Sequence, residues 1–206
     1  MLSIAIQAGG RSSRMGEDKA LRPFLGRPLI ERIVARLRPA ADELLITTNR
    51  PEDYAWLGLP LFTDLEPGRG ALGGLLTALS AARQPLVGVV ACDMPFASAK
   101  LIRRSAQLLQ EEAVDVVIAG TQAGLEPLHA VYRRSTCLPA VEAAIRMDLW
   151  KAVAWLPQVK VRRLTSAEVR LWDPSGRAFW NVNTPAEFSR AEALALADDQ
   201  DGTGGV

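Results

Sequence analysis

The 206-residue chain contains few of the residues on which several classes of protein depend. It has two cysteines, Cys92 and Cys137, and His129 is its only histidine. Neither cysteine belongs to a Cys-x-x-Cys motif, so a disulfide scaffold and a structural zinc site are not expected, and one histidine supports no histidine-based metal site. No apolar run reaches the roughly eighteen residues that a membrane-spanning helix needs. The sequence therefore predicts neither a disulfide-rich domain nor a membrane protein.

The chain also lacks an excess of charge of either sign. Its formal net charge is +1, so no overall field favours binding to nucleic acid or to an anionic membrane. The five tryptophans are scattered, without the interleaved basic residues that favour single-stranded nucleic acid. The N-terminus shows no basic-then-apolar pattern of a signal peptide, so we expect a cytoplasmic location. Any anion-binding site must therefore be local.

The distribution of apolar residues predicts alternating strands and helices. Short apolar runs favour strands over residues 2–7, 43–48, 60–63, 86–91, 114–118, 127–132, 159–163 and 179–182. Ser98 and the pair Thr184 and Glu187 are typical of residues that cap helices. We therefore expect an α/β fold, a three-layer αβα sandwich with a mostly parallel sheet, in one domain over residues 1–197. The acidic, then glycine-rich residues 198–206 are expected to form a disordered tail.

The most informative segment follows the first expected strand. This segment contains Gly9, Gly10 and Gly16 together with small polar residues, and Arg14 and Lys19 add positive charge. Glycine lets the backbone adopt positive φ and approach a ligand closely. Successive backbone N–H groups beside fixed cations suit a polyphosphate. Because the spacing is that of neither a Walker A loop nor a dinucleotide fingerprint, the sequence predicts a phosphate-binding loop of another kind.

Asp93 follows the most apolar of the expected strands, residues 86–91. Pro95 disfavours a helical conformation at Met94, so the chain turns where the carboxylate emerges. Ligands of mostly parallel sheets bind at the carboxyl ends of the strands, where the glycine-rich loop also lies. Because Mg²⁺ prefers one or two carboxylates together with phosphate oxygens, we expect Asp93 to bind Mg²⁺ rather than only to cap the next turn.

A second glycine cluster, Gly68–Gly74, contains the pattern G-x-G-x-x-G between an expected strand and an expected helix. Asp93 lies about twenty residues beyond it, as in an NAD-type site. The acidic residues Asp64 and Glu66 stand just before these glycines, however, where they would repel a pyrophosphate. An NAD-type dinucleotide-binding domain is therefore the less favoured interpretation.

The segment Ala8-Gly9-Gly10-(x)3-Arg14-Met15-Gly16-x-Asp18-Lys19 resembles the signature of nucleotidyltransferases built on a glycosyltransferase-A-like Rossmann fold. Within them it is most similar to the molybdenum cofactor guanylyltransferases, and Asn181-Val182-Asn183-Thr184-Pro185 resembles a second motif of that family. The resemblance implies transfer of GMP from Mg²⁺-GTP to the terminal phosphate of molybdopterin-bound molybdenum cofactor, with release of pyrophosphate. It further implies a molybdoenzyme as the recipient of the product.

The resemblance also implies roles for single residues. Backbone N–H groups of residues 8–10, with Arg14 and Lys19, would stabilise the departing pyrophosphate, and Gly70–Gly74 would lie against the guanine base. Asn181 and Asn183 alternate along an expected strand and so share a face, where amides suit a pterin or a phosphate. The expected catalytic residues are Arg14, Lys19 and Asp93; the nucleotide-binding residues are Gln7, Ala8, Gly9, Gly10, Lys19, Thr47, Asp64, Gly70, Gly74 and Asp93; and the acceptor-binding residues are Asn181, Asn183 and His129.

Three positions depart from the pattern of the family, and one of them is Ala71, which stands where proline is usual. Gln7 stands where leucine is usual, and Thr47 stands where the family has a nucleotide-contacting asparagine. A glutamine at this position either bonds the base or satisfies the neighbouring loop. Because the loop chemistry is shared more widely, a molybdenum cofactor cytidylyltransferase and a sugar-phosphate nucleotidyltransferase stay open as alternatives. A nucleotide-binding domain without catalysis is less favoured, because Lys19 and Asp93 are both present.

Overall fold

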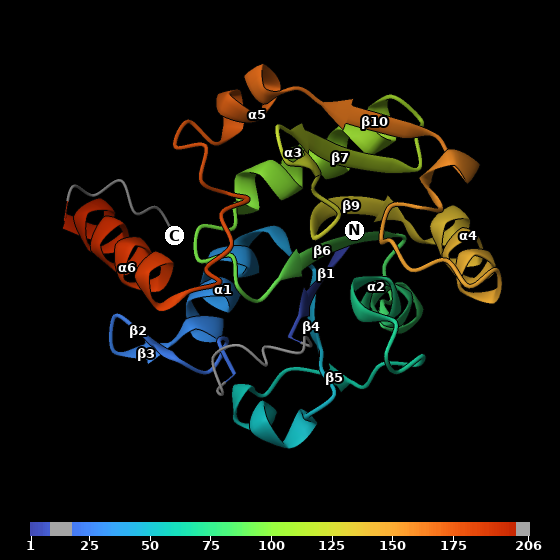
Figure 1. Ribbon diagram of the computed structural model, residues 1–206. Coiled ribbons are helices and arrows are strands. Elements are labelled where there is room, and N and C mark those ends of the chain that lie inside the picture. The colour runs from blue at the N-terminus through green and yellow to red at the C-terminus, as the bar shows by residue number, and fades with distance from the viewer. Residues whose placement is uncertain (9–17, 201–206) are drawn as a thin grey trace.

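The chain folds around a large β-sheet that has helices on both faces (Figure 1). The computed structural model describes residues 1–8 and 18–200. The strands lie side by side in the order β10 (Val161–Leu164), β7 (Val116–Thr121), β9 (His129–Arg133), β6 (Leu86–Ala91), β1 (Leu2–Gln7), β4 (Glu43–Thr47) and β5 (Leu61–Phe62), and β8 (Gly124–Leu125) pairs with β7. β9 is antiparallel to both of its neighbours, and the other pairs in this order are parallel. The expected α/β sandwich with a mostly parallel sheet is confirmed.

The helices form two layers, one on each face of the sheet. Buried side chains of α1 (Leu29–Leu37), α3 (Ala99–Glu111), α5 (Ser166–Trp172) and α6 (Pro185–Gln200) belong to one apolar core. Those of α2 (Gly70–Ala81) and α4 (Arg134–Arg146) belong to the other. Shorter elements lie in the connections: β2 (Pro23–Phe24), β3 (Arg27–Pro28), η1 (Arg38–Ala40), η2 (Pro51–Asp53), η3 (Ala55–Leu57) and η4 (Leu156–Gln158). None of the helices in the described parts of the chain has the length and apolar character needed to cross a bilayer.

Strands β1 and β6 are buried along their whole length. Ile4 and Ile6 pack in the core that contains α1 and α3, whereas Ala5 packs in the core that contains α2, because successive side chains of a strand point to opposite faces. An apolar run without alternation is what a strand covered on both faces requires. These two strands therefore hold their carboxyl ends in fixed positions at the centre of the sheet.

The expected helix caps are present. The Ser98 hydroxyl accepts a hydrogen bond from the Leu101 N–H at 3.2 Å and so begins α3. Thr184 and Glu187 form reciprocal bonds at the start of α6, with the Glu187 N–H donating to the Thr184 hydroxyl at 3.2 Å. Such caps satisfy N–H groups that have no partner within the helix.

The strand expected over residues 179–182 is not formed, and the chain there consists of a turn and an irregular segment. Its aromatic side chains are partly buried against other rings instead of along a sheet edge: Trp180 stacks on Phe96, and Phe179 lies edge-on to His129. A short aromatic run indicates burial, but burial of this kind does not require strand pairing. The other seven expected strands are present, with ends that differ by at most three residues.

Helix α6 extends further than the sequence indicated. It ends at Gln200, so residues 198–200 belong to the helix and not to a tail. The guanidinium of Arg177 contacts both carboxylate oxygens of Asp198, at 2.9 and 2.8 Å, and ties this last turn to the segment that precedes it. Residues 201–206 lie outside the described residues.

His129 connects the sheet to α3. It lies in β9 opposite Val90, it is 3% exposed, and its Nε2 accepts a hydrogen bond from the Ser98 N–H at 3.1 Å. Burial lowers the pKa of His129 to about 4, because the imidazolium would lose its hydration. The neutral ring is therefore the form that the fold stabilises.

We predict that stability falls between pH 7 and pH 5 through His129. The folded pKa of about 4 lies below the unfolded value of about 6.5, so the unfolded chain binds the proton first and the free energy of unfolding decreases as the pH is lowered. The expected loss at pH 5 is about 2 kcal/mol, measured by urea denaturation. In His129→Gln, which does not titrate in this range, the loss should be smaller by that amount. An equal loss in both proteins would contradict the prediction.

Candidate active site

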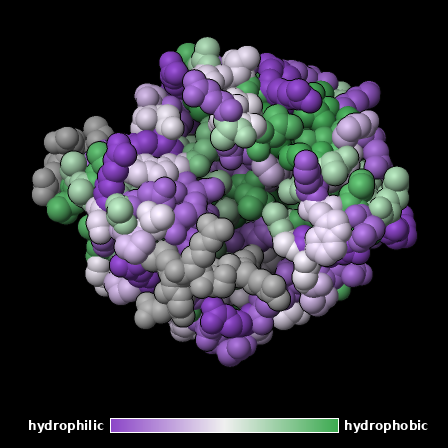
Figure 2. Space-filling view, in the orientation of Figure 1, coloured by the Kyte–Doolittle hydropathy of each residue, from purple (hydrophilic) through white to green (hydrophobic). Residues whose placement is uncertain are grey.

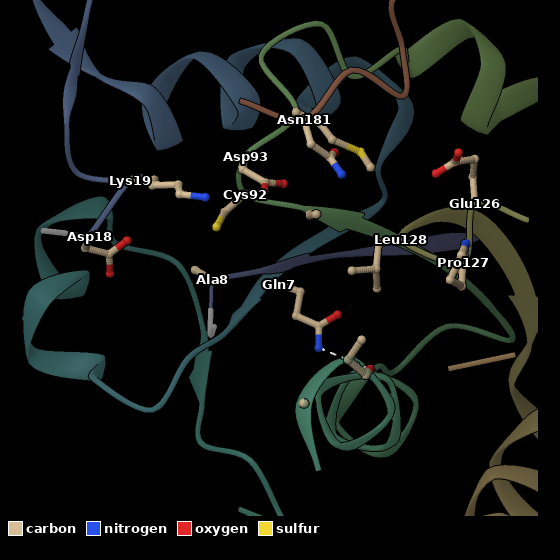
Figure 3. Close-up of a pocket in the computed structure, with 14 residues that line it drawn as sticks. Gln7, Ala8, Asp18, Lys19, Cys92, Asp93, Glu126, Pro127, Leu128 and Asn181 are labelled. Carbon is tan, nitrogen blue, oxygen red and sulfur yellow. Dashed lines mark hydrogen bonds between the residues drawn. The ribbon is translucent and has the colours of Figure 1, made fainter. Parts of the chain in front are cut away.

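A cavity of ≈ 450 Å³ opens at the carboxyl ends of β1 and β6. Figure 2 shows it as a hollow near the centre of one face, with hydrophobic side chains inside and hydrophilic ones around it. Among the described residues it is lined by Gln7, Ala8, Asp18, Lys19, Gly70, Ala71, Ala91, Cys92, Asp93, Met94, Glu126, Pro127, Leu128 and Asn181 (Figure 3). The position agrees with the expectation that ligands bind where parallel strands end.

The pairing of β1 with β6 brings the first two parts of the site together. Gln7 and Ala91, the last residues of the two strands, lie side by side in the sheet. The pairing continues past the strands, where the Cys92 N–H donates to the Gln7 carbonyl oxygen at 3.1 Å. Asp93, the next residue, therefore emerges directly above the end of β1.

Asp93 lines the cavity with a carboxylate that the protein leaves incompletely bonded. Its Oδ1 is buried and has no hydrogen-bond partner among the described residues. Burial raises the pKa of Asp93, and the positive charge of Lys19 opposes that rise. No cluster of three or more His, Cys, Asp or Glu side chains suited to a metal occurs in residues 1–8 and 18–200. A single carboxylate oxygen nevertheless fits Mg²⁺ when phosphate and water supply the remaining ligands.

Lys19 reaches the cavity from the other side of the site. Its Nζ donates a hydrogen bond to Asn183 Oδ1 at 2.8 Å. The residue before it, Asp18, is held firmly, because its carboxylate accepts bonds from the Ala20 N–H at 3.0 Å and the Tyr54 hydroxyl at 2.7 Å and pairs with Arg50. These contacts hold the Lys19 ammonium at the edge of the cavity that contains Asp93.

The segment before α6 closes one side of the cavity. The Val182 N–H donates to the Asp93 carbonyl oxygen at 2.9 Å, which brings Asn181 to the cavity wall. Asn181 Oδ1 is buried without a partner among the described residues. Asn183 is exposed and does not line the cavity, but its side chain holds Lys19. The two asparagine side chains thus lie in different surroundings. The expectation that they share one strand face did not predict this difference.

Ala8 lines the cavity, but its N–H group is not free for a phosphate. It donates to the Thr47 carbonyl oxygen at 2.8 Å and so extends the pairing of β1 with β4. The expectation that the N–H groups of residues 8–10 bind phosphate is therefore incorrect for Ala8. Gly9, Gly10 and Arg14 lie outside the described residues.

Asp64, Thr47 and His129 were expected in the site but do not line the cavity. Asp64 forms two hydrogen bonds with Asn49, at 2.8 and 3.2 Å, and Thr47 is 1% exposed in β4 beside Gln7. His129 is buried, and its Nε2 is already occupied by Ser98. The geometry therefore favours a packing role for His129 over contact with an acceptor. Its Nδ1 is buried without a hydrogen-bond partner among the described residues.

The glycines of α2 shape the opposite wall. Gly70, with φ +56°, begins the helix at the cavity, and Gly74 lies one turn further in, directly beneath Gln7. Gly74 itself does not line the cavity, and a Cβ atom there would lie 1.4 Å from Gln7 Nε2, so any other residue would force the Gln7 side chain to move. The close approach of β1 to α2 therefore depends on this residue.

Asp18, Cys92 and Glu126 line the cavity but were not selected from the sequence. Asp18 and Cys92 directly precede the selected residues Lys19 and Asp93, and Glu126 lies three positions before His129. This proximity was the signal in the sequence that could have found them. Burial raises the pKa of the Cys92 thiol, which keeps it neutral. The carboxylate of Glu126 accepts a bond from the Thr121 hydroxyl at 2.9 Å.

Comparison with known proteins agrees with this geometry. The family model for the MobA-like NTP transferase domain matches residues 4–160. A probable molybdenum cofactor guanylyltransferase of Carboxydothermus hydrogenoformans is 39% identical over 92% of this chain and 94% of its own length. The molybdenum cofactor guanylyltransferase of Desulfosudis oleivorans is 35% identical over 93% of this chain and 95% of its own.

Solved structures are also similar to this chain. The molybdopterin-guanine dinucleotide biosynthesis protein A of Archaeoglobus fulgidus superposes with a TM-score of 0.82 at 25% identity, over 95% of this chain and 99% of that one. A CMP:2-keto-3-deoxy-manno-octonic acid synthetase, at 14% identity and a TM-score of 0.71 over 96% of this chain and 99% of its own, shares the fold. The chain therefore belongs to the MobA-like nucleotidyltransferase family, among relatives named molybdenum cofactor guanylyltransferases.

Proposed function

We propose that the chain transfers GMP from Mg²⁺-GTP to the terminal phosphate of molybdopterin-bound molybdenum cofactor and releases pyrophosphate. The observation that carries this proposal is the meeting of Lys19 and the unpartnered Asp93 Oδ1 in one cavity at the end of β1. A fixed cation and a free carboxylate oxygen are what a metal-bound triphosphate needs. The names of the relatives support guanine as the base and the molybdenum cofactor as the acceptor.

The transfer is an in-line displacement at the α-phosphorus of GTP. An oxygen of the acceptor phosphate forms a bond to this phosphorus while the bond to the bridging oxygen breaks, and pyrophosphate leaves with that electron pair. The attacking phosphate is already ionised, so no side chain has to remove a proton. The protein's contribution is to position the two substrates and to stabilise the charge that develops.

Lys19 is suited to stabilise the leaving pyrophosphate. Its ammonium has three donors, and only one of them is used by Asn183. Among the described residues the other two donors have no partner, and they would be available to phosphate oxygens. On the opposite side, the free amide oxygen of Asn181 is suited to bind a donor group of the pterin. Lys19 and Asn181 would thus act on the leaving group and on the acceptor, respectively.

Asp93 is the residue that would hold Mg²⁺ in this site. When bound, Mg²⁺ supplies positive charge that neutralises phosphate oxygens during phosphoryl transfer. Asp93 contributes a negative charge in a place where burial already disfavours ionisation, so a cation nearby would restore the ionised form.

A reducing cytoplasm suits a chain whose Cys92 and Cys137 are both free. A molybdoenzyme is the proposed recipient of the product.

We predict selective stabilisation of the protein by GTP with Mg²⁺. A ligand at a hundredfold excess over its dissociation constant should raise the free energy of unfolding by about 2.7 kcal/mol. Thermal unfolding with GTP, CTP, ATP, UTP and NAD, each with and without Mg²⁺, measures the effect. A shift with CTP that equals or exceeds that with GTP would argue against guanylyl transfer, and a shift with NAD alone would revive the dinucleotide interpretation.

Replacing Lys19 with alanine should nearly abolish turnover while the protein stays folded. By analogy with the loss of one oxyanion donor, we expect a reduction in kcat of about 10²–10³-fold. Pyrophosphate release with GTP and acceptor is the measurement. Lys100→Ala, which removes an exposed lysine outside the cavity, is the matched control and should behave as wild type. Near-normal release by a folded Lys19→Ala protein would remove Lys19 from the mechanism.

Asp93→Asn should raise the Mg²⁺ concentration needed for turnover or abolish turnover. Asparagine preserves the shape of the side chain but removes the charge that attracts a hard cation. GTP affinity without metal should stay level or rise, because a repulsive carboxylate is gone, and affinity with metal should fall towards the same value. Titrating Mg²⁺ against pyrophosphate release tests this. A wild-type Mg²⁺ activation curve would show that Asp93 only shapes the turn before Pro95.

A further inference from the structure

Gln7 presents an unused hydrogen-bond acceptor at the cavity wall. The side chain is 6% exposed, lies at the end of β1 and lines the cavity. Its Nε2 donates to the Ala71 carbonyl oxygen at 3.3 Å, whereas its Oε1 is buried and has no partner among the described residues. Half of this amide is therefore used by the fold, and the other half is not.

The orientation of the amide is determined by its neighbours. Because the Ala71 carbonyl accepts hydrogen bonds, the side-chain nitrogen must face α2 and the oxygen must face away from it (Figure 3). Gly74 has no side chain and so allows α2 to lie this close to Gln7, since a Cβ atom there would overlap Gln7 Nε2. The oxygen is thus held in place before any ligand binds.

Part of the wall of the cavity that Gln7 lines is apolar. Ala71, Ala91 and Leu128 line the same cavity. A buried polar group without a partner costs about 1–3 kcal/mol, and a ligand donor that reaches it recovers this free energy. A site built to bond one polar group rejects analogues that lack it far more strongly than an apolar wall does. Gln7 therefore favours a ligand with a donor at this place.

We propose that Gln7 Oε1 accepts a hydrogen bond from the exocyclic 2-amino group of the guanine of GTP, so that Gln7 determines specificity for the base. The inference rests on the proposed function. Guanine offers two donors on this edge, its ring N1–H and its 2-amino group. The amino group projects further from the ring than N1–H does, and Oε1 is buried at the cavity wall. Of the two donors, the 2-amino group is therefore the one that reaches Oε1.

Comparison of GTP with ITP tests the proposal, because ITP lacks only the 2-amino group. Isothermal titration calorimetry gives the dissociation constant of each nucleotide for wild type and for Gln7→Met, which keeps the length of the side chain but loses the amide. Wild type should bind GTP about tenfold more tightly than ITP. In Gln7→Met the two should bind within about twofold of each other. Gln84→Met, at the opposite end of β6, is the matched control and should keep the wild-type ratio.

Each outcome separates this inference from the proposed function. If Gln7→Met weakens GTP and ITP by the same factor, or if wild type does not distinguish them, Gln7 only fills the wall and the inference is overturned while a preference for GTP over CTP stands. If wild type prefers CTP to GTP, both the proposed function and the inference are overturned. Melting temperatures without nucleotide show whether the variants are folded. If Gln7→Met does not fold, Gln7→Ala, which also removes the amide but adds no bulk beside Gly74, is measured in the same way with the same expected loss of preference.

Discussion

The parallel pairing of β1 with β4 and β6 is the constraint on which the rest of the structure depends. It places Gln7 beside Thr47 on one side and beside Ala91 on the other, so that the loops after three strands leave the sheet at one level. Burial of apolar side chains on both faces sets this register, because a shift of one residue would turn each side chain to the wrong face. The position of the cavity is therefore a consequence of how the apolar core packs.

The cavity gathers polar atoms that the fold leaves without partners. Gln7 Oε1, Asp93 Oδ1 and Asn181 Oδ1 are all buried, they lack partners among the described residues, and their side chains all line the cavity. Most buried polar groups in proteins are hydrogen-bonded, so a concentration of exceptions indicates a place prepared for a ligand. The free energy lost at these atoms is offset by the extensive apolar burial below them, and a ligand that bonded them would recover it.

Charge in the site is positioned by contacts between distant parts of the chain. Lys19 bonds Asn183, which precedes α6, and Asp18 is held by Tyr54 and Arg50 from the connection after β4. Each of these bonds joins residues more than thirty positions apart. Residues 18 and 19, at the end of the proposed triphosphate-binding loop, are thus anchored from two sides, which keeps the Lys19 cation in place.

The sequence by itself determined the order of strands and helices, the caps and the kind of chemistry, because these depend on local features. The ends of β1 and β6 follow directly from their apolar runs, and the glycine-rich segment and Asp93 carry their chemical meaning in residue type and spacing. Only the tertiary structure decided which polar residues face the cavity. His129 is bonded within the core, whereas Gln7, Asn181 and Glu126 reach the cavity wall. The physical reason is that a side chain's surroundings are set by strand register and helix packing between residues far apart in the chain, and no local pattern encodes those contacts.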